Sequence, residues 1–119
     1  MATVYVLEDC LISQNLVMDI LQAANTFCLG CRRIQEALHT MSIAPPDLIL
    51  LEPLMDRRHG FKFFDQIRQD PATRHIPIIL VTAASKSTVQ NLLATDGGPT
   101  LYRSKPYDPH ELVAIAQAL

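Results

Sequence analysis

The chain has 119 residues, 49% of them hydrophobic, and its ten lysines and arginines against twelve aspartates and glutamates give a net charge of −2. This length excludes two full domains and is enough for a core that needs no disulfide or metal, so we expect a single domain over residues 1–119. The charge balance excludes the evenly basic surface of a general nucleic-acid binder, and we expect no direct nucleic-acid partner.

The apolar runs and the cysteines lead us to expect a soluble cytoplasmic protein with no membrane partner. The N-terminal apolar run has no basic region before it and is cut short by Glu8 and Asp9, unlike a signal peptide, and no other apolar run is long enough to span a membrane. Cys10, Cys28 and Cys31 are an odd and sparse set, which suits a reducing compartment better than a disulfide framework.

Short apolar runs along the chain predict β-strands. In chain order they are Thr3–Leu7, Phe27–Cys31, Leu48–Leu51, Ile78–Val81 and Leu101–Arg103. The first, third and fourth runs are almost continuously hydrophobic, which is typical of parallel strands that are covered on both faces.

Apolar residues at helical spacing follow each of these runs. The sets are Ile12, Leu16, Ile20, Leu21 and Ala24; Ile34, Ala37, Leu38 and Met41; Phe63, Phe64 and Ile67; Val89, Leu92 and Leu93; and Leu112, Ile115, Ala116 and Leu119. We expect the third helix to end at Asp70-Pro71 and the fourth at Asp96-Gly97-Gly98-Pro99.

The last helix has the clearest start signal. Asp108 can cap it, Pro109 suits its first turn, and Glu111 can reach back to the cap.

The strict alternation of strand and helix predicts an α/β fold with helices on both faces of a parallel sheet. The simplest arrangement is a flavodoxin-like, doubly wound (βα)5 sheet with strand order 2-1-3-4-5. In such sheets function lies outside the carboxyl ends of the strands, so the residues at those ends are the candidate site.

Charged and polar residues follow the strand ends in order. They are Glu8 and Asp9, Glu52, Thr82, and Lys105. Carboxylates brought together at about 4 Å repel by roughly 1 to 4 kcal/mol per pair, so this cluster needs a cation. Either Lys105 or a hard ion such as Mg²⁺ can supply it, and Thr82 can donate a hydrogen bond to an oxyanion.

Several motifs, agreeing in order and spacing, resemble the receiver domain of response regulators over almost the whole chain, from Thr3 to Leu119. They are Glu8-Asp9, the run Pro46-Asp47-Leu48-Ile49-Leu50-Leu51 that leads to the acidic Glu52, Gly60, the run Pro77-Ile78-Ile79-Leu80-Val81-Thr82-Ala83, and Lys105-Pro106-Tyr107. The resemblance implies a role in two-component signal transduction, in a phosphorelay, and not an enzyme.

The resemblance also implies roles for individual residues. Glu8, Asp9 and Glu52 match the Mg²⁺-binding acids, and Glu52 stands at the phosphoacceptor position. Thr82 and Lys105 match the residues that contact the phosphoryl group, and Tyr102 matches the aromatic residue that changes rotamer on activation.

The sequence departs from the family at the phosphoacceptor position, where Glu52 replaces the usual aspartate. One extra methylene displaces the attacking oxygen by more than the roughly 1 Å that can cost about a hundredfold in rate. We therefore expect a pseudo-receiver that acts by protein–protein interaction, with Mg²⁺ binding weakened or absent. The alternative is a conventional Mg²⁺-dependent phosphoacceptor that uses Glu52 or Asp56.

The resemblance implies a histidine kinase or another signalling protein as partner. It also allows a homodimer through the face made by the fourth helix, the fifth strand and the fifth helix, on or near which Tyr102, Arg103 and Tyr107 are expected. A purely structural network of Glu8, Glu52 and Lys105 stays open. Nucleotide binding is not expected, because no glycine-rich loop follows the first strand.

Three further motifs have simpler explanations. Cys28-Leu29-Gly30-Cys31 has C-x-x-C spacing, but residues three apart on a strand face opposite sides, so we expect buried thiols and no redox or zinc site. Phe61, Phe63 and Phe64 are expected in the core. Arg57-Arg58-His59 is either a solvated loop or a patch that attracts phosphate or an acidic partner.

Overall fold

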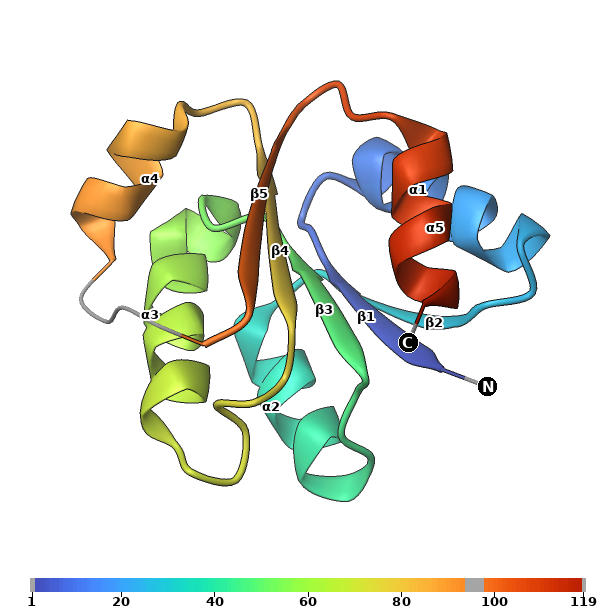
Figure 1. Cartoon of the computed structure of the whole chain (residues 1–119). Helices are drawn as coiled ribbons and strands as arrows, with labels where there is room; N and C mark the ends of the chain where they lie inside the picture. The colour runs from blue at the N-terminus through green and yellow to red at the C-terminus, as the bar shows by residue number, and fades with distance from the viewer. Residues whose placement is uncertain (1, 94–97, 119) are drawn as a thin grey trace.

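The computed structural model describes residues 2–93 and 98–118. Strands and helices alternate along the chain (Figure 1), as β1 (Thr3–Leu7), α1 (Leu11–Ala23), β2 (Phe27–Cys31), α2 (Ile34–Ile43), β3 (Leu48–Leu51), α3 (Met55–Gln69), β4 (Ile78–Thr82), α4 (Lys86–Leu92), β5 (Thr100–Ser104) and α5 (Pro109–Gln117). No helix of this described part is long and apolar enough to cross a membrane.

The strands form a parallel sheet in the order β2-β1-β3-β4-β5, with α1 and α5 on one face and α2, α3 and α4 on the other (Figure 1). The predicted flavodoxin-like fold and strand order are confirmed. Buried strands carry apolar residues on both faces because helices cover both, which explains why Leu48–Leu51 reads as one continuous apolar run.

Alternation along the strands divides the core into two layers. In β1, Tyr5 and Leu7 pack on the side of α2 and α3, while Val4 and Val6 pack on the side of α1 and α5. Cys28 and Cys31 follow the same rule and lie in different layers, so their thiols diverge as the sequence predicts.

Element ends agree with the sequence signals where those signals are local. Asp70 caps the end of α3, and the Asp108 carboxylate accepts a hydrogen bond from the backbone N–H of His110 at 2.9 Å at the start of α5. The expectation that Glu111 reaches back to this cap is wrong, because its carboxylate pairs with the guanidinium of Arg103 on β5. Part of the expected end of the fourth helix, at Asp96 and Gly97, lies outside the described residues.

The start of α3 is irregular. Its assignment begins at Met55, but Asp56, Arg57 and Arg58 have left-handed backbones with φ of 51°, 55° and 69°. Residues other than glycine rarely adopt this backbone conformation, so the segment between β3 and the regular part of α3 is conformationally strained. The phenylalanines that follow are buried in the core, as expected.

Candidate functional site

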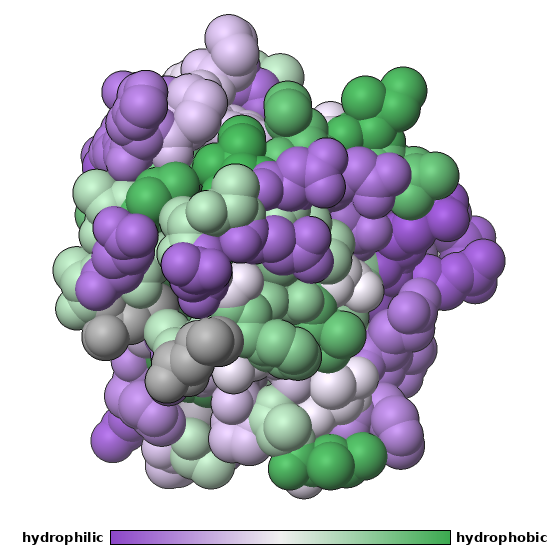
Figure 2. Space-filling view, turned by 90° about the vertical axis from the view of Figure 1, so that its right-hand side faces the viewer, coloured by the Kyte–Doolittle hydropathy of each residue, from purple (hydrophilic) through white to green (hydrophobic). Residues whose placement is uncertain are grey.

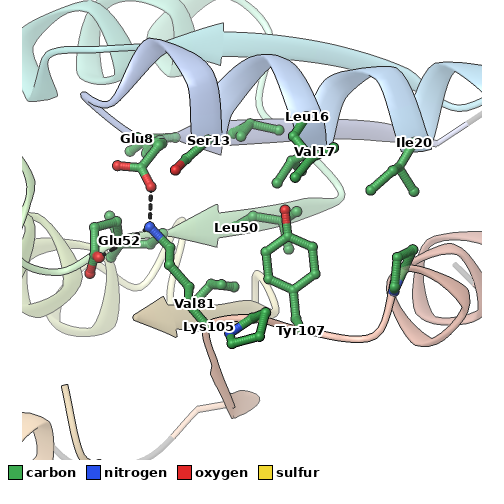
Figure 3. A pocket seen from close by; sticks show the side chains of 15 residues that line it. Glu8, Ser13, Leu16, Val17, Ile20, Leu50, Glu52, Val81, Lys105 and Tyr107 are labelled. Atoms are coloured by element: carbon green, nitrogen blue, oxygen red, sulfur yellow. Dashed lines mark hydrogen bonds and ion pairs between the residues drawn. The ribbon is translucent and has the colours of Figure 1, made fainter. Parts of the chain in front are cut away.

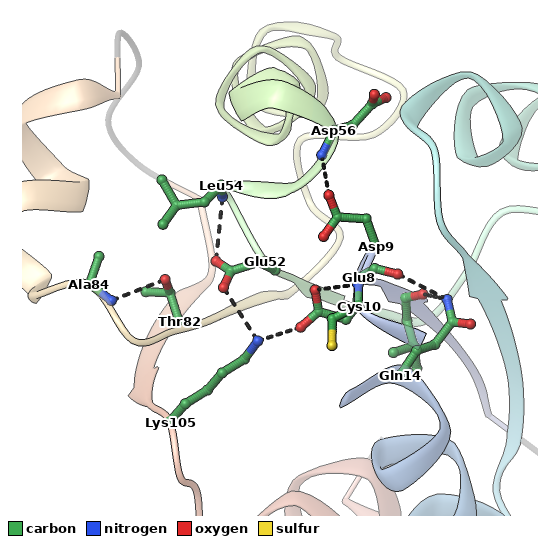
Figure 4. Close-up of polar contacts among 11 residues, drawn as sticks. Glu8, Asp9, Cys10, Gln14, Glu52, Leu54, Asp56, Thr82, Ala84 and Lys105 are labelled. Carbon is green, nitrogen blue, oxygen red and sulfur yellow. Dashed lines mark hydrogen bonds and ion pairs between the residues drawn. The ribbon is translucent and has the colours of Figure 1, made fainter. Parts of the chain in front are cut away.

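The site lies at the carboxyl ends of β1, β3, β4 and β5, where backbone hydrogen bonds continue the sheet beyond the strands (Figure 4). The Glu8 N–H donates to the carbonyl of Cys31 at 3.1 Å, and the Glu52 N–H donates to that of Leu7 at 3.0 Å. The Lys105 N–H donates to the carbonyl of Thr82 at 3.0 Å. These bonds fix where each functional side chain leaves the backbone.

Lys105 is the centre of the polar cluster. Its ammonium forms an ion pair with Glu8 Oε1 and lies 3.3 Å from Glu52 Oε1. The second carboxylate oxygens accept from backbone, with Cys10 N–H 3.3 Å from Glu8 Oε2 and Leu54 N–H 3.4 Å from Glu52 Oε2. In each carboxylate, one oxygen therefore contacts Lys105 and the other contacts a backbone N–H.

The electrostatics of this cluster favour a charged lysine. Partial burial alone lowers the pKa of Lys105, but the hydrogen bonds and negative charges of Glu8 and Glu52 outweigh it and hold the pKa above its usual value. The side chains of Glu8 and Glu52 are only 7% and 12% exposed, so neither carboxylate is compensated by bulk water.

Asp9 does not join this cluster. Its carboxylate accepts a hydrogen bond from the Asp56 backbone N–H at 2.8 Å (Figure 4). The Asp56 carboxylate in turn accepts from the Ile34 N–H at 3.1 Å at the start of α2. The sequence brought Asp9 next to Glu8, but the left-handed backbone at Asp56 aims an N–H at Asp9 instead. Asp9 thus ties the loop after β1 to the loop after β3.

Thr82 and Tyr102 come from the neighbouring strands β4 and β5. Thr82 is buried, and its hydroxyl accepts a hydrogen bond from the Ala84 N–H at 3.2 Å. Tyr102 is partly buried against the core, and the Lys86 ammonium lies 5.2 Å from the centre of its ring. Thr82 is the last residue of β4, and Tyr102 lies in the middle of β5.

A cavity of about 390 Å³ opens beside the polar cluster, between α1 and the connection from β5 to α5 (Figure 3). Tyr107, which the sequence places on or near the α4, β5 and α5 face, instead lines this cavity and packs with the layer of α1. Leu16 and Ile20 also line the cavity, which the sequence did not indicate because their helical spacing is the same as that of ordinary core residues.

The family model of the response regulator receiver domain matches residues 4–117 of this chain. The chain belongs to this family. Among curated relatives, the receiver is 28% identical over 117 residues to the phosphate regulon transcriptional regulatory protein PhoB of Pseudomonas aeruginosa, a match that covers 98% of the chain and 51% of PhoB. It is 34% identical over 74 residues to the response regulator PleD of Caulobacter vibrioides, covering 62% of the chain and 16% of PleD. The chain therefore spans about half the length of PhoB.

Solved structures of receivers share the fold. The chemotaxis protein CheY4 of Vibrio cholerae superposes with a TM-score of 0.85 at 24% identity, over 99% of this chain and 98% of that chain. The receiver domain of the sensor histidine kinase PA1611 from Pseudomonas aeruginosa gives 0.84 at 21% identity, over 98% and 95%, and contains a magnesium ion in its active-site cleft. Receiver domains are signalling domains and not enzymes in the ordinary sense.

The acids that the family uses for Mg²⁺ are not gathered around one point in this receiver. Glu8 and Glu52 both pair with Lys105, and Asp9 is turned to Asp56. Within residues 2–93 and 98–118, no three or more His, Cys, Asp or Glu side chains are grouped so that they could hold a metal ion. All three carboxylates are thus engaged with other groups of the chain.

Proposed function

We propose that this receiver is a pseudo-receiver, which signals through protein–protein interaction with Glu52 in place of the phosphorylatable aspartate. The observation that supports this most is the engagement of both Glu52 oxygens, one 3.3 Å from the Lys105 ammonium and the other 3.4 Å from the Leu54 N–H. A nucleophile must present an oxygen in line with the donor, and both Glu52 oxygens are held by these contacts in an orientation set by Lys105 and the Leu54 backbone.

The ion pair also suggests what the glutamate replaces. In the family, the lysine at this position contacts the phosphoryl group, and here Lys105 contacts the longer carboxylate of Glu52 directly. The carboxylate carries one negative charge and two acceptor oxygens, against nearly two charges and three oxygens for a phosphoryl group. The Glu52 carboxylate is therefore a partial mimic of a phosphoryl group. We infer that it holds the receiver in one state, so that phosphorylation does not switch it.

The proposal includes the Mg²⁺ site of Glu8, Asp9 and Glu52, where we expect binding of the ion to be weakened or absent. An ion there has to compete with the Lys105 ammonium for Glu8 and Glu52, and it also has to turn Asp9 away from Asp56. A shorter carboxylate at position 52 would loosen the contact with Lys105, so we expect Mg²⁺ to bind more tightly to Glu52→Asp than to the parent in a titration.

The partners we propose are a histidine kinase or another signalling protein, and a second copy of this chain through the face of α4, β5 and α5. Leu92 on α4 and Leu101 on β5 are 47% and 42% exposed, and Tyr102 on β5 is partly buried against the core. A partner that senses Thr82 and Tyr102 distinguishes this function from a network that only holds the strand ends together.

The experiment that tests the proposal is intact mass spectrometry after incubation with Mg²⁺ and acetyl phosphate. We expect no phosphoryl adduct on the parent and an adduct on Glu52→Asp, because one methylene is removed while Thr82 and Lys105 stay in place. Glu52→Gln is the matched control, since it keeps the length of the side chain without a nucleophile. A stoichiometric adduct on Glu52 of the parent contradicts the proposal.

The alternative is a conventional receiver that accepts phosphate on Glu52 or Asp56. Asp56 is the weaker candidate, because its carboxylate accepts from the Ile34 N–H at 3.1 Å and points away from Lys105 (Figure 4). An adduct that survives in Glu52→Gln but is lost in Asp56→Asn would favour Asp56 as the acceptor.

A further inference from the structure

The cavity beside the polar cluster has the features of a small-molecule site. Its volume of about 390 Å³ lies in the range of ligand pockets, and it is bounded by α1 on one side and by the connection from β5 to α5 on the other (Figure 3). The walls are mostly apolar and come from side chains that are far apart in the sequence, chiefly Leu16, Val17, Ile20, Leu50, Val81 and Tyr107.

Part of the apolar wall of the cavity is exposed to solvent. Leu16, at the mouth of the cavity, is 56% exposed, although Val17, Leu50 and Val81 deeper in are buried. The side of the molecule that carries α1 and α5 faces the viewer in Figure 2, where hydrophobic side chains lie exposed over its upper part. An apolar body placed in the cavity removes this surface from water, which is favourable in proportion to the area buried.

One end of the cavity is polar and negatively charged. Glu8 and Glu52 line it together with Lys105, so two carboxylates meet one ammonium and the sum is −1. The low exposure of both carboxylates leaves this charge poorly screened, so a cation is favoured over a neutral or anionic group. The Tyr107 hydroxyl points across the cavity toward α1 and adds a polar atom part-way along the apolar wall (Figure 3).

We propose that this cavity binds a small organic amine, with its apolar body between α1 and Tyr107 and its ammonium at Glu8 and Glu52. The ammonium shares these carboxylates with Lys105, so occupancy changes the contacts of the residue at the phosphoacceptor position without phosphorylation. The inference rests on the cavity and its charge and goes beyond the proposed function.

The test compares three probes that have a phenylalkyl body of three or four methylenes and different head groups: phenylbutylamine, phenylbutanol and phenylbutyrate. Titrations of the ¹⁵N-labelled chain are followed by two-dimensional NMR, which reports affinity and location together. We expect saturable shifts in α1 and in residues 105–107, with the amine binding at least about tenfold more tightly than the butyrate, as a charge-assisted contact predicts.

Two variants locate the body and the head of the probe. Leu16→Trp fills the mouth of the cavity and should abolish the shifts, whereas Ile12→Trp should not, because Ile12 lies on the same helix, is 82% exposed and does not line the cavity. Glu52→Gln should reduce the preference for the amine over phenylbutanol. Circular dichroism melts of all variants show that each is folded.

The titrations can contradict the inference in three ways. Lack of saturable binding by any probe, equal binding of amine and butyrate, or shifts that persist in Leu16→Trp would each overturn the inference. Because phosphorylation is read by mass in a separate experiment, a phosphoryl adduct on Glu52 would remove the proposed function and leave amine binding to be judged on its own titration.

Discussion

At the scale of single residues, Lys105 has the largest electrostatic role in the site. Its ammonium pairs with Glu8, a residue 97 positions away in the sequence, and also with Glu52. The Glu8 side chain is only 7% exposed, so it depends on this pair for compensation of its charge. Replacing the lysine therefore affects stability as well as signalling.

We expect Lys105→Met to lower the free energy of unfolding by about 2 kcal/mol, because it leaves buried carboxylates without a cation. Urea denaturation measures this loss. In the double variant Lys105→Met with Glu8→Gln, part of the stability should return, since the more buried of the two uncompensated charges is gone. If the loss of stability in the double variant equals the sum of the losses in the two single variants, the pair of Lys105 and Glu8 contributes little.

Burial raises the pKa of the Cys31 thiol from an ordinary value near 9 to about 11. The neutral thiol is favoured in the folded chain, so this contribution to stability is complete below pH 9 and is lost as the pH rises from about 9 to about 11. We expect a loss of up to about 2 kcal/mol across this window. Denaturant midpoints at several pH values should therefore fall less steeply for Cys31→Ala than for the parent.

At the scale of elements, the loop between β3 and α3 brings backbone into close contact with Gly60. A Cβ atom at this position would lie 2.5 Å from the carbonyl oxygen of Pro53 and 2.8 Å from that of Glu52. Both neighbours are backbone atoms of the segment that positions the Glu52 side chain. Glycine at position 60 therefore allows the first regular turn of α3 to pack against the end of β3.

We predict that Gly60→Ala destabilises the chain by about 1 to 3 kcal/mol, although alanine is the better helix former, because the backbone has to shift. Lys62→Ala is the matched control on an exposed position of the same helix and should change stability by less than about 0.5 kcal/mol. Thermal unfolding compares the two, and a neutral Gly60→Ala would contradict the close approach.

At the scale of the whole molecule, the two layers of helices leave different surfaces for partners. The face of α4, β5 and α5 carries Leu92 and Leu101, both more than 40% exposed, and it is the face on which we propose dimerisation. The opposite edge of the sheet, at β2, carries the half-exposed Phe27.

If the chain dimerises through α4, β5 and α5, sedimentation equilibrium should show association that depends on concentration. Leu101→Glu should weaken it by at least about tenfold, since a charge would be buried in the interface. Ile43→Glu is the control, because Ile43 is 73% exposed at the end of α2 and lies away from that face. A monomer at every concentration, or an equal effect of both substitutions, would argue against this interface.

The sequence by itself determined the fold class, the strand order and the residue types at the strand ends. The bounds of β1, β2 and β3 are as predicted, because strand and helix patterns are carried by neighbours along the chain, and Asp108-Pro109 and Asp70-Pro71 set helix ends for the same local reason. Glu52 could be singled out without a structure, since the apolar run before it leads directly to that position.

Only the tertiary structure decided how these side chains choose their partners. Asp9 turns to Asp56 and Glu111 to Arg103, although each had a plausible partner nearby in the sequence, because loops and strands far along the chain bring other groups within reach. The cavity beside Lys105 is of the same kind. An unfilled space between α1 and Tyr107 depends on how two elements at opposite ends of the chain pack, and no local pattern of residues encodes that packing.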